Sequence, residues 1–215
     1  MLKIWGRRNS HNVQKVMWLV GELGLAHEHS PAGGAFGLVD TPEFRAMNPH
    51  GRVPVIDDDG VVVWESQAIL RYLASVYGKD GVWPEDLAAR ALQDQWMDWS
   101  ATALQPDFLN GVFWGFYRTP QAERNTQAVA EKIAACARHF EMLDRVLQTR
   151  PYLSGEQFGL ADIPVGTVLF RYFTLDIDRP DVPHVQAWRR RIEERPAYRE
   201  HVMIDYSDLF ARLAY

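Results

Sequence analysis

The chain has 215 residues, so one small domain and one medium-sized domain are expected. Hydrophobic residues make up 47% of it and charged residues 24%, which is typical of a folded globular protein. A formal net charge of -5 disfavours nucleic acid as a partner, because phosphate groups repel it. No apolar run approaches the roughly 18 residues of a membrane span, and residues 1–9 lack the apolar stretch of a secretory signal. We therefore expect a cytoplasmic protein with no membrane partner.

The first half of the chain begins with a short strand at Lys3–Trp5 and continues with a helix. Apolar residues recur at helical spacing from Val13 to Leu23, and Gly24 provides a stop. A second strand near Glu28 is weakly indicated. After a loop rich in Gly and Ala, the sequence Thr41-Pro42-Glu43 predicts a short helix that ends at Asn48-Pro49.

A hairpin follows the short helix. Its strands are expected at Val53–Ile56 and Val61–Trp64, and the acidic residues and glycine of 57–60 form the turn. Helical spacing then returns from Ile69 to Gly78. The predicted order is βαβαββα, an α/β domain that covers residues 1–78.

The second half is expected to be entirely helical. Residues 79–84 are polar and rich in turn-forming residues, which is typical of a linker between domains. Residues 85–215 then form an all-α domain in which prolines interrupt the helical pattern. Its helices are predicted near 86–116, 121–148, 161–175 and 184–194.

Cysteine and histidine offer little chemistry. Cys136 is the lone cysteine, so no internal disulfide can form, and its helical setting favours a small core residue over a nucleophile. The histidines, including His27 and His29, are not grouped with other ligands at metal-binding spacing. No metal is expected.

Three motifs accompany this order of elements. Residues 48–55 read NPHGRVPV, residues 65–69 read ESQAI, and Trp188 is followed by the RPA of residues 195–197. With the domain order, they resemble the cytosolic glutathione transferase family over essentially the whole chain. The resemblance implies a thioredoxin-like domain before the helical one, a cis bond at Val53-Pro54, glutathione as co-substrate and a homodimer.

The second domain departs from the family pattern at one position. The family's helix-capping signature has Ser or Thr three residues before an Asp, whereas Gly159 precedes Asp162 here. Because glycine is also an acceptable cap, at a cost of a few tenths of a kcal/mol, we expect only a slight effect on stability.

The resemblance implies several glutathione contacts. The backbone at Val53 and Pro54 would pair with the extended tripeptide like an added strand. Ser66 at a helix start would bind the γ-glutamyl carboxylate, and Glu65 would accept from the ammonium. Without the resemblance, Ser66 is an ordinary N-cap and Glu65 a favourable acid in the first turn.

Three further polar residues have weaker support. Arg52 could neutralise the glycine carboxylate of glutathione, but a solvated arginine in a turn fits the sequence as well. Asp98 and Gln105 lie seven residues apart on one helical face and resemble positions that contact glutathione in relatives. Both also fit a solvated helix surface.

The family resemblance places the glutathione sulfur between the first strand and the first helix, where this chain has Ser10. A thiol pKa of about 8.5 leaves little thiolate at neutral pH, and lowering it by two units takes about 2.7 kcal/mol. A charge-assisted hydrogen bond supplies roughly 1.5 to 3 kcal/mol and a helix N-terminus roughly 0.3 to 1. Ser10 could also act only as the helix N-cap.

Asn12 offers a second donor beside Ser10. Some bacterial members of the family have an Asn two residues after a Ser or Thr in a similar motif. We predict that Ser10 is the principal hydrogen-bond donor to the sulfur and that Asn12 assists it, although the sequence leaves open which of the two contributes more. His11 is a further candidate, as a base. Because no cysteine stands here, mixed-disulfide chemistry through the enzyme is not expected.

The predicted reaction is attack of the thiolate on a small hydrophobic electrophile. Aromatic residues crowd the first long helix of the second domain, and Phe113 and Tyr117 are the candidates for the electrophile pocket. Two alternatives stay open: a glutathione-dependent peroxidase or disulfide reductase, and a noncatalytic carrier with the same fold.

Overall fold

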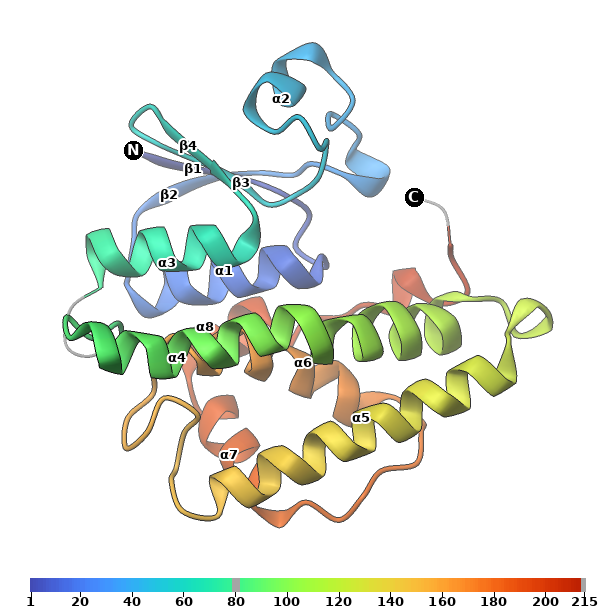
Figure 1. Cartoon of the computed structure of the whole chain (residues 1–215). Helices are drawn as coiled ribbons and strands as arrows, with labels where there is room; N and C mark the ends of the chain where they lie inside the picture. The colour runs from blue at the N-terminus through green and yellow to red at the C-terminus, as the bar shows by residue number, and fades with distance from the viewer. Residues whose placement is uncertain (79–81, 214–215) are drawn as a thin grey trace.

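A computed structural model describes residues 1–78 and 82–213 and shows an α/β layer stacked on a helical layer (Figure 1). Of the predicted linker 79–84, residues 79–81 lie outside the described residues. The boundaries of the two domains stay a prediction.

The amino-terminal domain contains a four-stranded mixed sheet. Its strands are β1 (Leu2–Trp5), β2 (His27–Ser30), β3 (Val55–Asp58) and β4 (Val61–Trp64), in the order β2-β1-β3-β4. Strand β1 is parallel to β2 and antiparallel to β3, and β3 is antiparallel to β4. The element order βαβαββα and the thioredoxin-like fold class are confirmed.

Helices cover both faces of this sheet. Helices α1 (His11–Glu22) and α3 (Ser66–Tyr77) lie on the face towards the helical layer, and α2 (Pro42–Met47) lies on the other (Figure 1). The alternation of β3 explains this, because Ile56 joins the main core while Val55 packs with Phe44 of α2. The side chain of Thr41 caps α2 by accepting from the Phe44 amide at 3.2 Å.

The hairpin differs slightly from the prediction. Strand β3 begins at Val55, two residues later than expected, because the proline before it has no N–H for the ladder. The strand also runs on to Asp58, so that the turn narrows to Asp59 and Gly60, both with positive φ. Positive φ at both central residues suits a two-residue hairpin turn.

Helix α1 joins the two layers. It packs against α3 in its own domain and against two helices of the second domain, α6 (Asp162–Thr174) and α8 (Pro196–His201). The Trp18 ring is fully buried there and lies edge-on to Tyr198, with 4.7 Å between centroids. The amino-terminal end of α1 is therefore fixed relative to both domains.

Among its described residues the second domain has helices joined by loops, one isolated bridge between Tyr152 and Gly155, and no strand, in agreement with the predicted all-helical class. Its first long helix comprises α4 and two π-helical segments, η2 and η3, that continue from it (Figure 1). Short 3-10 turns lie at Gly34–Phe36, Gln121–Glu123 and Ser207–Leu209. The remaining bounds are α4 (Leu87–Trp99), η2 (Ser100–Leu104), η3 (Pro106–Arg118), α5 (Thr126–Leu147) and α7 (Pro183–Glu193).

Two helix boundaries differ from the prediction. Helix α5 begins at Thr126 rather than near 121, because the Asn125 side chain accepts from the Ala128 amide at 3.0 Å and caps it there. Helix α8 was not predicted, although Pro196 stands at its first position, where proline is favoured.

The departure at Gly159 has a structural reason. The buried Asp162 carboxylate accepts from the amides of Leu153 and Gly159 and from the Trp188 indole, at 2.8, 3.1 and 3.0 Å. A Cβ on Gly159 would lie only 2.7 Å from the Cβ of Ser154. Glycine at position 159 therefore makes room for Ser154, and does not merely replace a weakly preferred cap.

Candidate functional site

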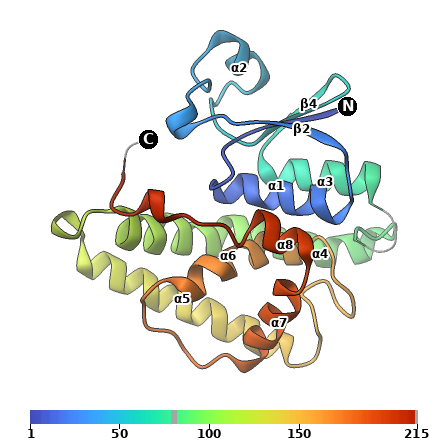
Figure 2. The same cartoon turned by 180° about the vertical axis from the view of Figure 1, so that it is seen from behind.

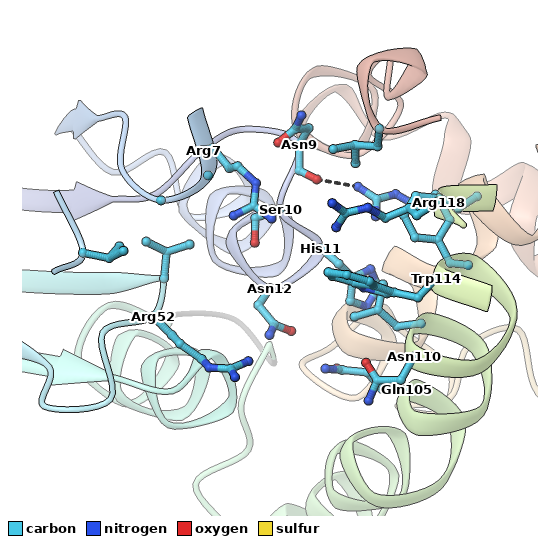
Figure 3. A pocket seen from close by; sticks show the side chains of 18 of the residues that line it. Arg7, Asn9, Ser10, His11, Asn12, Arg52, Gln105, Asn110, Trp114 and Arg118 are labelled. Atoms are coloured by element: carbon cyan, nitrogen blue, oxygen red, sulfur yellow. Dashed lines mark hydrogen bonds between the residues drawn. The ribbon is translucent and has the colours of Figure 1, made fainter. Parts of the chain in front are cut away.

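A cavity of about 520 Å³ lies between the two domains, at the amino-terminal end of α1. Figure 3 shows side chains from the first domain and from the η3 helix facing it from opposite sides. Its lining contains Arg7, Asn9, Ser10, His11, Asn12, Gly33, Gly34, Val39, Gly51, Arg52, Val53, Gln105, Leu109, Asn110, Phe113, Trp114, Arg118, Arg171 and Leu209.

Ser10 occupies the N-cap position of α1 and lines the cavity. Its side chain makes no capping hydrogen bond within the described helix, and it is 8% exposed. The purely structural alternative, a serine that caps α1 through its hydroxyl, is therefore not what the geometry shows. Ser10 directly precedes the first turn of α1, where the amides and the helix dipole favour an anion.

Asn12 is the second residue of α1, lines the same cavity and accepts a hydrogen bond from Lys15. The Asn12 Oδ1 accepts from the Lys15 Nζ at 3.0 Å, and the Gln105 Oε1 accepts from the same nitrogen at 2.5 Å. Lys15 itself is 1% exposed. Burial lowers the pKa of Lys15 to about 7, and the charge of Glu65 opposes that shift.

His11 also lines the cavity and is buried. Neither ring nitrogen has a hydrogen-bond partner among the described residues. Burial lowers the pKa of His11 well below its ordinary value, and the charges of Lys15 and Arg171 act in the same direction. The imidazole is therefore neutral at physiological pH and a weak base.

The loop before β3 supplies the facing part of the lining. The bond between Val53 and Pro54 is cis, and both Arg52 and Val53 line the cavity. The Arg52 side chain extends towards the space in front of Asn12 (Figure 3). The structure thus brings together four of the residues predicted for the first domain: Ser10, Asn12, Arg52 and Val53.

Glu65 and Ser66 begin α3 next to this loop but are not among the cavity-lining residues. Ser66 is buried, and Glu65 has a φ of 70°. Positive φ is uncommon for a residue with a side chain and concentrates at ligand-binding sites.

Asp98 is not brought into the cavity. Its carboxylate accepts from Arg71 at 2.5 Å, and its side chain is 67% exposed. Its assignment to glutathione stays a prediction. Gln105, by contrast, lines the cavity and bonds to Lys15, so it is not the solvated residue that the sequence also allowed.

Aromatic side chains of η3 form part of the cavity wall. Phe113 and Trp114 line the cavity together with Leu109. Tyr117 lies one layer behind, stacked on Phe113 with 5.3 Å between ring centroids and packed edge-on against Tyr206. Tyr117 therefore packs behind the cavity wall, whereas the aromatic rings that line the cavity itself are those of Phe113 and Trp114.

Three arginines in the lining were not predicted: Arg7, Arg118 and Arg171. The Arg118 guanidinium lies 3.8 Å from the Trp114 ring centroid and donates to the Arg212 carbonyl at 2.8 Å. Arg171 donates to the Asn9 carbonyl at 2.7 Å, the dashed line of Figure 3. The cavity is consequently more polar than the apolar pocket expected for the electrophile.

The one cysteine of the chain lies outside the cavity lining. Cys136 is fully buried in the helical core, as predicted, and burial raises the pKa of its thiol to about 12. Within residues 1–78 and 82–213, no His, Cys, Asp and Glu side chains gather in threes as a metal site requires. The helices of these residues include none with the length and apolarity to cross a membrane.

Two family models match the chain. The glutathione S-transferase N-terminal domain matches residues 1–75, and the glutathione S-transferase C-terminal domain matches residues 105–196. The first contains the α1 end of the cavity and the cis-proline loop, and the second contains the wall formed by η3.

Relatives of known name match nearly the whole chain. Glutathione S-transferase GstB of Escherichia coli K12 is 38% identical over 209 residues, covering 96% of this chain and 100% of the relative. Glutathione S-transferase 3 of Zea mays is 32% identical and covers 94% and 93%. Among solved structures, a theta class glutathione S-transferase from Xanthomonas axonopodis pv. citri with glutathione bound is 44% identical, with a TM-score of 0.90 and coverage of 95% and 98%.

Proposed function

The chain belongs to the glutathione S-transferase family, and we propose that it binds glutathione with the sulfur at Ser10 and Asn12 and transfers it to a small hydrophobic electrophile. The observation that carries the proposal is the position of both side chains in the cavity lining, at the amino-terminal end of α1. The chain is a transferase, and the proposal concerns the residues and the acceptor.

The proposed chemistry at sulfur needs donors and no strong base. The Ser10 hydroxyl and the Asn12 amide each have a proton to donate to a thiolate. One such bond contributes roughly 1.5 to 3 kcal/mol and the helix end roughly 0.3 to 1, so together they suffice to lower a thiol pKa of about 8.5 by about two units. His11 is neutral and weakly basic, so the released proton leaves for solvent.

The rest of glutathione would extend from this point along the first domain. The Val53 backbone beside the cis-proline is available for strand-like pairing, and Arg52 reaches towards the same space. We place the γ-glutamyl carboxylate at the start of α3, on the Ser66 hydroxyl and the helix amides, with Glu65 accepting from the ammonium. The positive φ of Glu65 supports this placement.

The acceptor would occupy the η3 side of the cavity. Leu109, Phe113 and Trp114 provide apolar contacts, and about 520 Å³ is ordinary for a small-molecule site. Tyr117 takes part indirectly, by fixing the Phe113 ring. No metal enters the proposed reaction.

The proposal includes a homodimer in the cytoplasm. Apolar side chains are exposed on β4, α3 and α4, where a second copy could cover them: Val61, Val62, Trp64, Val76, Leu87 and Leu92. A cytoplasmic location fits a reaction that consumes reduced glutathione, because that compartment keeps thiols reduced.

Turnover of the parent, Ser10→Ala and Asn12→Ala with an aryl halide tests the sulfur site. We expect kcat/KM to fall about ten- to a hundredfold for Ser10→Ala, which corresponds to the loss of one charge-assisted hydrogen bond, and by a smaller factor for Asn12→Ala. Ser75→Ala, an exposed change on α3, is the matched control and should retain the parental rate.

The same assay separates the alternatives. Faster turnover of an organic peroxide or a disulfide than of any carbon electrophile would favour the peroxidase or reductase, and glutathione binding without turnover would favour the carrier. Full rates in both variants, with glutathione still bound, would refute the assignment of Ser10 and Asn12.

A further inference from the structure

Lys15 is buried between the two domains and touches two residues of the cavity lining. Its Nζ donates to Asn12 of the same helix at 3.0 Å and to Gln105 of the second domain at 2.5 Å. Asn12 and Gln105 line the cavity, whereas Lys15 does not, and its side chain is 1% exposed. Lys15 therefore lies behind the cavity wall, in contact with its polar groups.

The chemistry of these groups fixes their orientation. A lysine nitrogen donates its protons, so the atom that each amide turns towards it must be the oxygen. Each amide has one oxygen and one NH₂ group on opposite sides, which leaves the NH₂ group directed away from Lys15. Since both residues line the cavity, Lys15 selects amide rotamers that present N–H donors there.

We propose that Lys15 is a positioning residue that holds the Asn12 amide with its NH₂ group towards the sulfur of bound glutathione. This inference rests on the proposed function, and it identifies the residue that orients Asn12, one of the two proposed donors to the thiolate. With the amide reversed, an oxygen would face the thiolate and destabilise it. Gln105, held by the same nitrogen, ties this arrangement to the second domain.

The arrangement does not depend on the charge of Lys15. An ammonium has three protons and a neutral amine has two, so either form can donate to both amide oxygens. The charged groups that act on this region are Glu65 at the start of α3, which acts on Lys15, and Arg171 on α6, which acts on the neutral, titratable His11 of α1.

Lys15→Met tests the proposal, because methionine has a similar length and no donor. We expect the thiol pKa of bound glutathione, followed by thiolate absorbance, to rise by about one unit, and kcat at neutral pH to fall about threefold with the loss of thiolate. KM for glutathione should change less than about twofold, because the tripeptide's other contacts remain. An unchanged thiol pKa would overturn the proposal.

A double-mutant cycle identifies the route of the effect. In an Asn12→Ala background, Lys15→Met should no longer raise the thiol pKa, since the residue through which Lys15 acts is gone. Additive effects would mean that the lysine charge acts directly on the sulfur, and would overturn the proposal. They would leave the proposed function intact, because Ser10→Ala tests that separately.

Asn12→Asp provides a check that does not require Lys15 to be replaced. Aspartate keeps an oxygen for Lys15 and places a second oxygen where the NH₂ group was. We expect it to raise the thiol pKa further than Asn12→Ala does, because it adds repulsion to the loss of a donor. A thiol pKa in Asn12→Asp equal to that of the parent would refute the proposed amide orientation.

Discussion

At the scale of single residues, Lys15 combines a functional position with a cost in stability. A buried ammonium loses its hydration, and two amide oxygens replace only part of it. Burial accordingly lowers the pKa of Lys15 from 10.5 to about 7. Between these two values the unfolded chain binds a proton that the folded chain has released, so this group makes stability rise with pH there.

The sign of this effect predicts the behaviour of Lys15→Met. The variant should be more stable than the parent by about 1–3 kcal/mol at and below neutral pH, because an apolar side chain replaces a buried charge. This advantage should shrink as pH rises from about 7 towards about 10.5, where the parent no longer buries an ammonium. Urea unfolding of both proteins across this range measures it, and a parent more stable than the variant at neutral pH would contradict it.

The candidate site was predictable where its residues are close in sequence. Ser10 and Asn12 belong to one helix start, and Arg52 and Val53 belong to one motif, so local patterns predicted them. Arg118 and Arg171 belong to separate helices that only the folded second domain brings to the cavity. No local signal distinguishes these two from the many solvated arginines of the chain.

At the scale of elements, Gly159 shows how a family pattern can mislead. The usual Ser or Thr suggests that glycine weakens the cap of α6, but the space for that side chain is already filled. A Cβ at position 159 would lie 2.6 Å from the Ser154 Oγ and 3.0 Å from the Gln93 Oε1. The neighbouring serine thus excludes the residue that the family prefers.

Gly159→Ser should therefore destabilise the protein. We expect the free energy of unfolding to fall by about 1–3 kcal/mol, the usual cost of overpacking a filled site. Adding Ser154→Gly should recover most of that loss, because it removes the Cβ that the new side chain meets. Urea unfolding of the parent, both single variants and the double variant measures the coupling, and a single Gly159→Ser variant as stable as the parent would disprove it.

The elements themselves were largely predictable, because hydrophobic periodicity reports one buried face. Helix α1 and the hairpin were found in this way. Strand β2 was only weakly indicated, since its residues are polar and half-buried at the sheet edge. Helix α8 has only six residues, too few to show a period.

At the scale of the whole molecule, several exposed apolar side chains lie on elements along one side. Strand β4, helix α3 and the start of α4 lie along the same side in both views (Figures 1 and 2). Leu87 and Leu92 are 77% and 63% exposed there, and Val62 is 42% exposed. Exposed apolar residues gathered in this way mark interaction surfaces.

Charge on this surface should dissociate the proposed homodimer. The double variant Val62→Glu and Leu92→Glu would place like charges within the interface, and we expect a sedimenting mass of one chain instead of two at about 10 µM. Phe36→Ser is the control, because Phe36 is an exposed apolar residue away from β4, α3 and α4. This variant should still sediment with the mass of two chains. A parent that sediments as one chain would rule out the dimer.

The π-helical segments η2 and η3 affect how acceptor sites can be compared among relatives. Each residue of an ordinary helix turns the chain by about 100°, and a wider turn holds an additional residue. A relative with one residue fewer between Trp99 and Leu109 would therefore aim its counterparts of Phe113 and Trp114 elsewhere, even where the aligned letters agree. A single alignment gap in this helix therefore rotates the side chains that follow it. Identical residues after the gap can then face different directions, and they do not imply the same substrate preference.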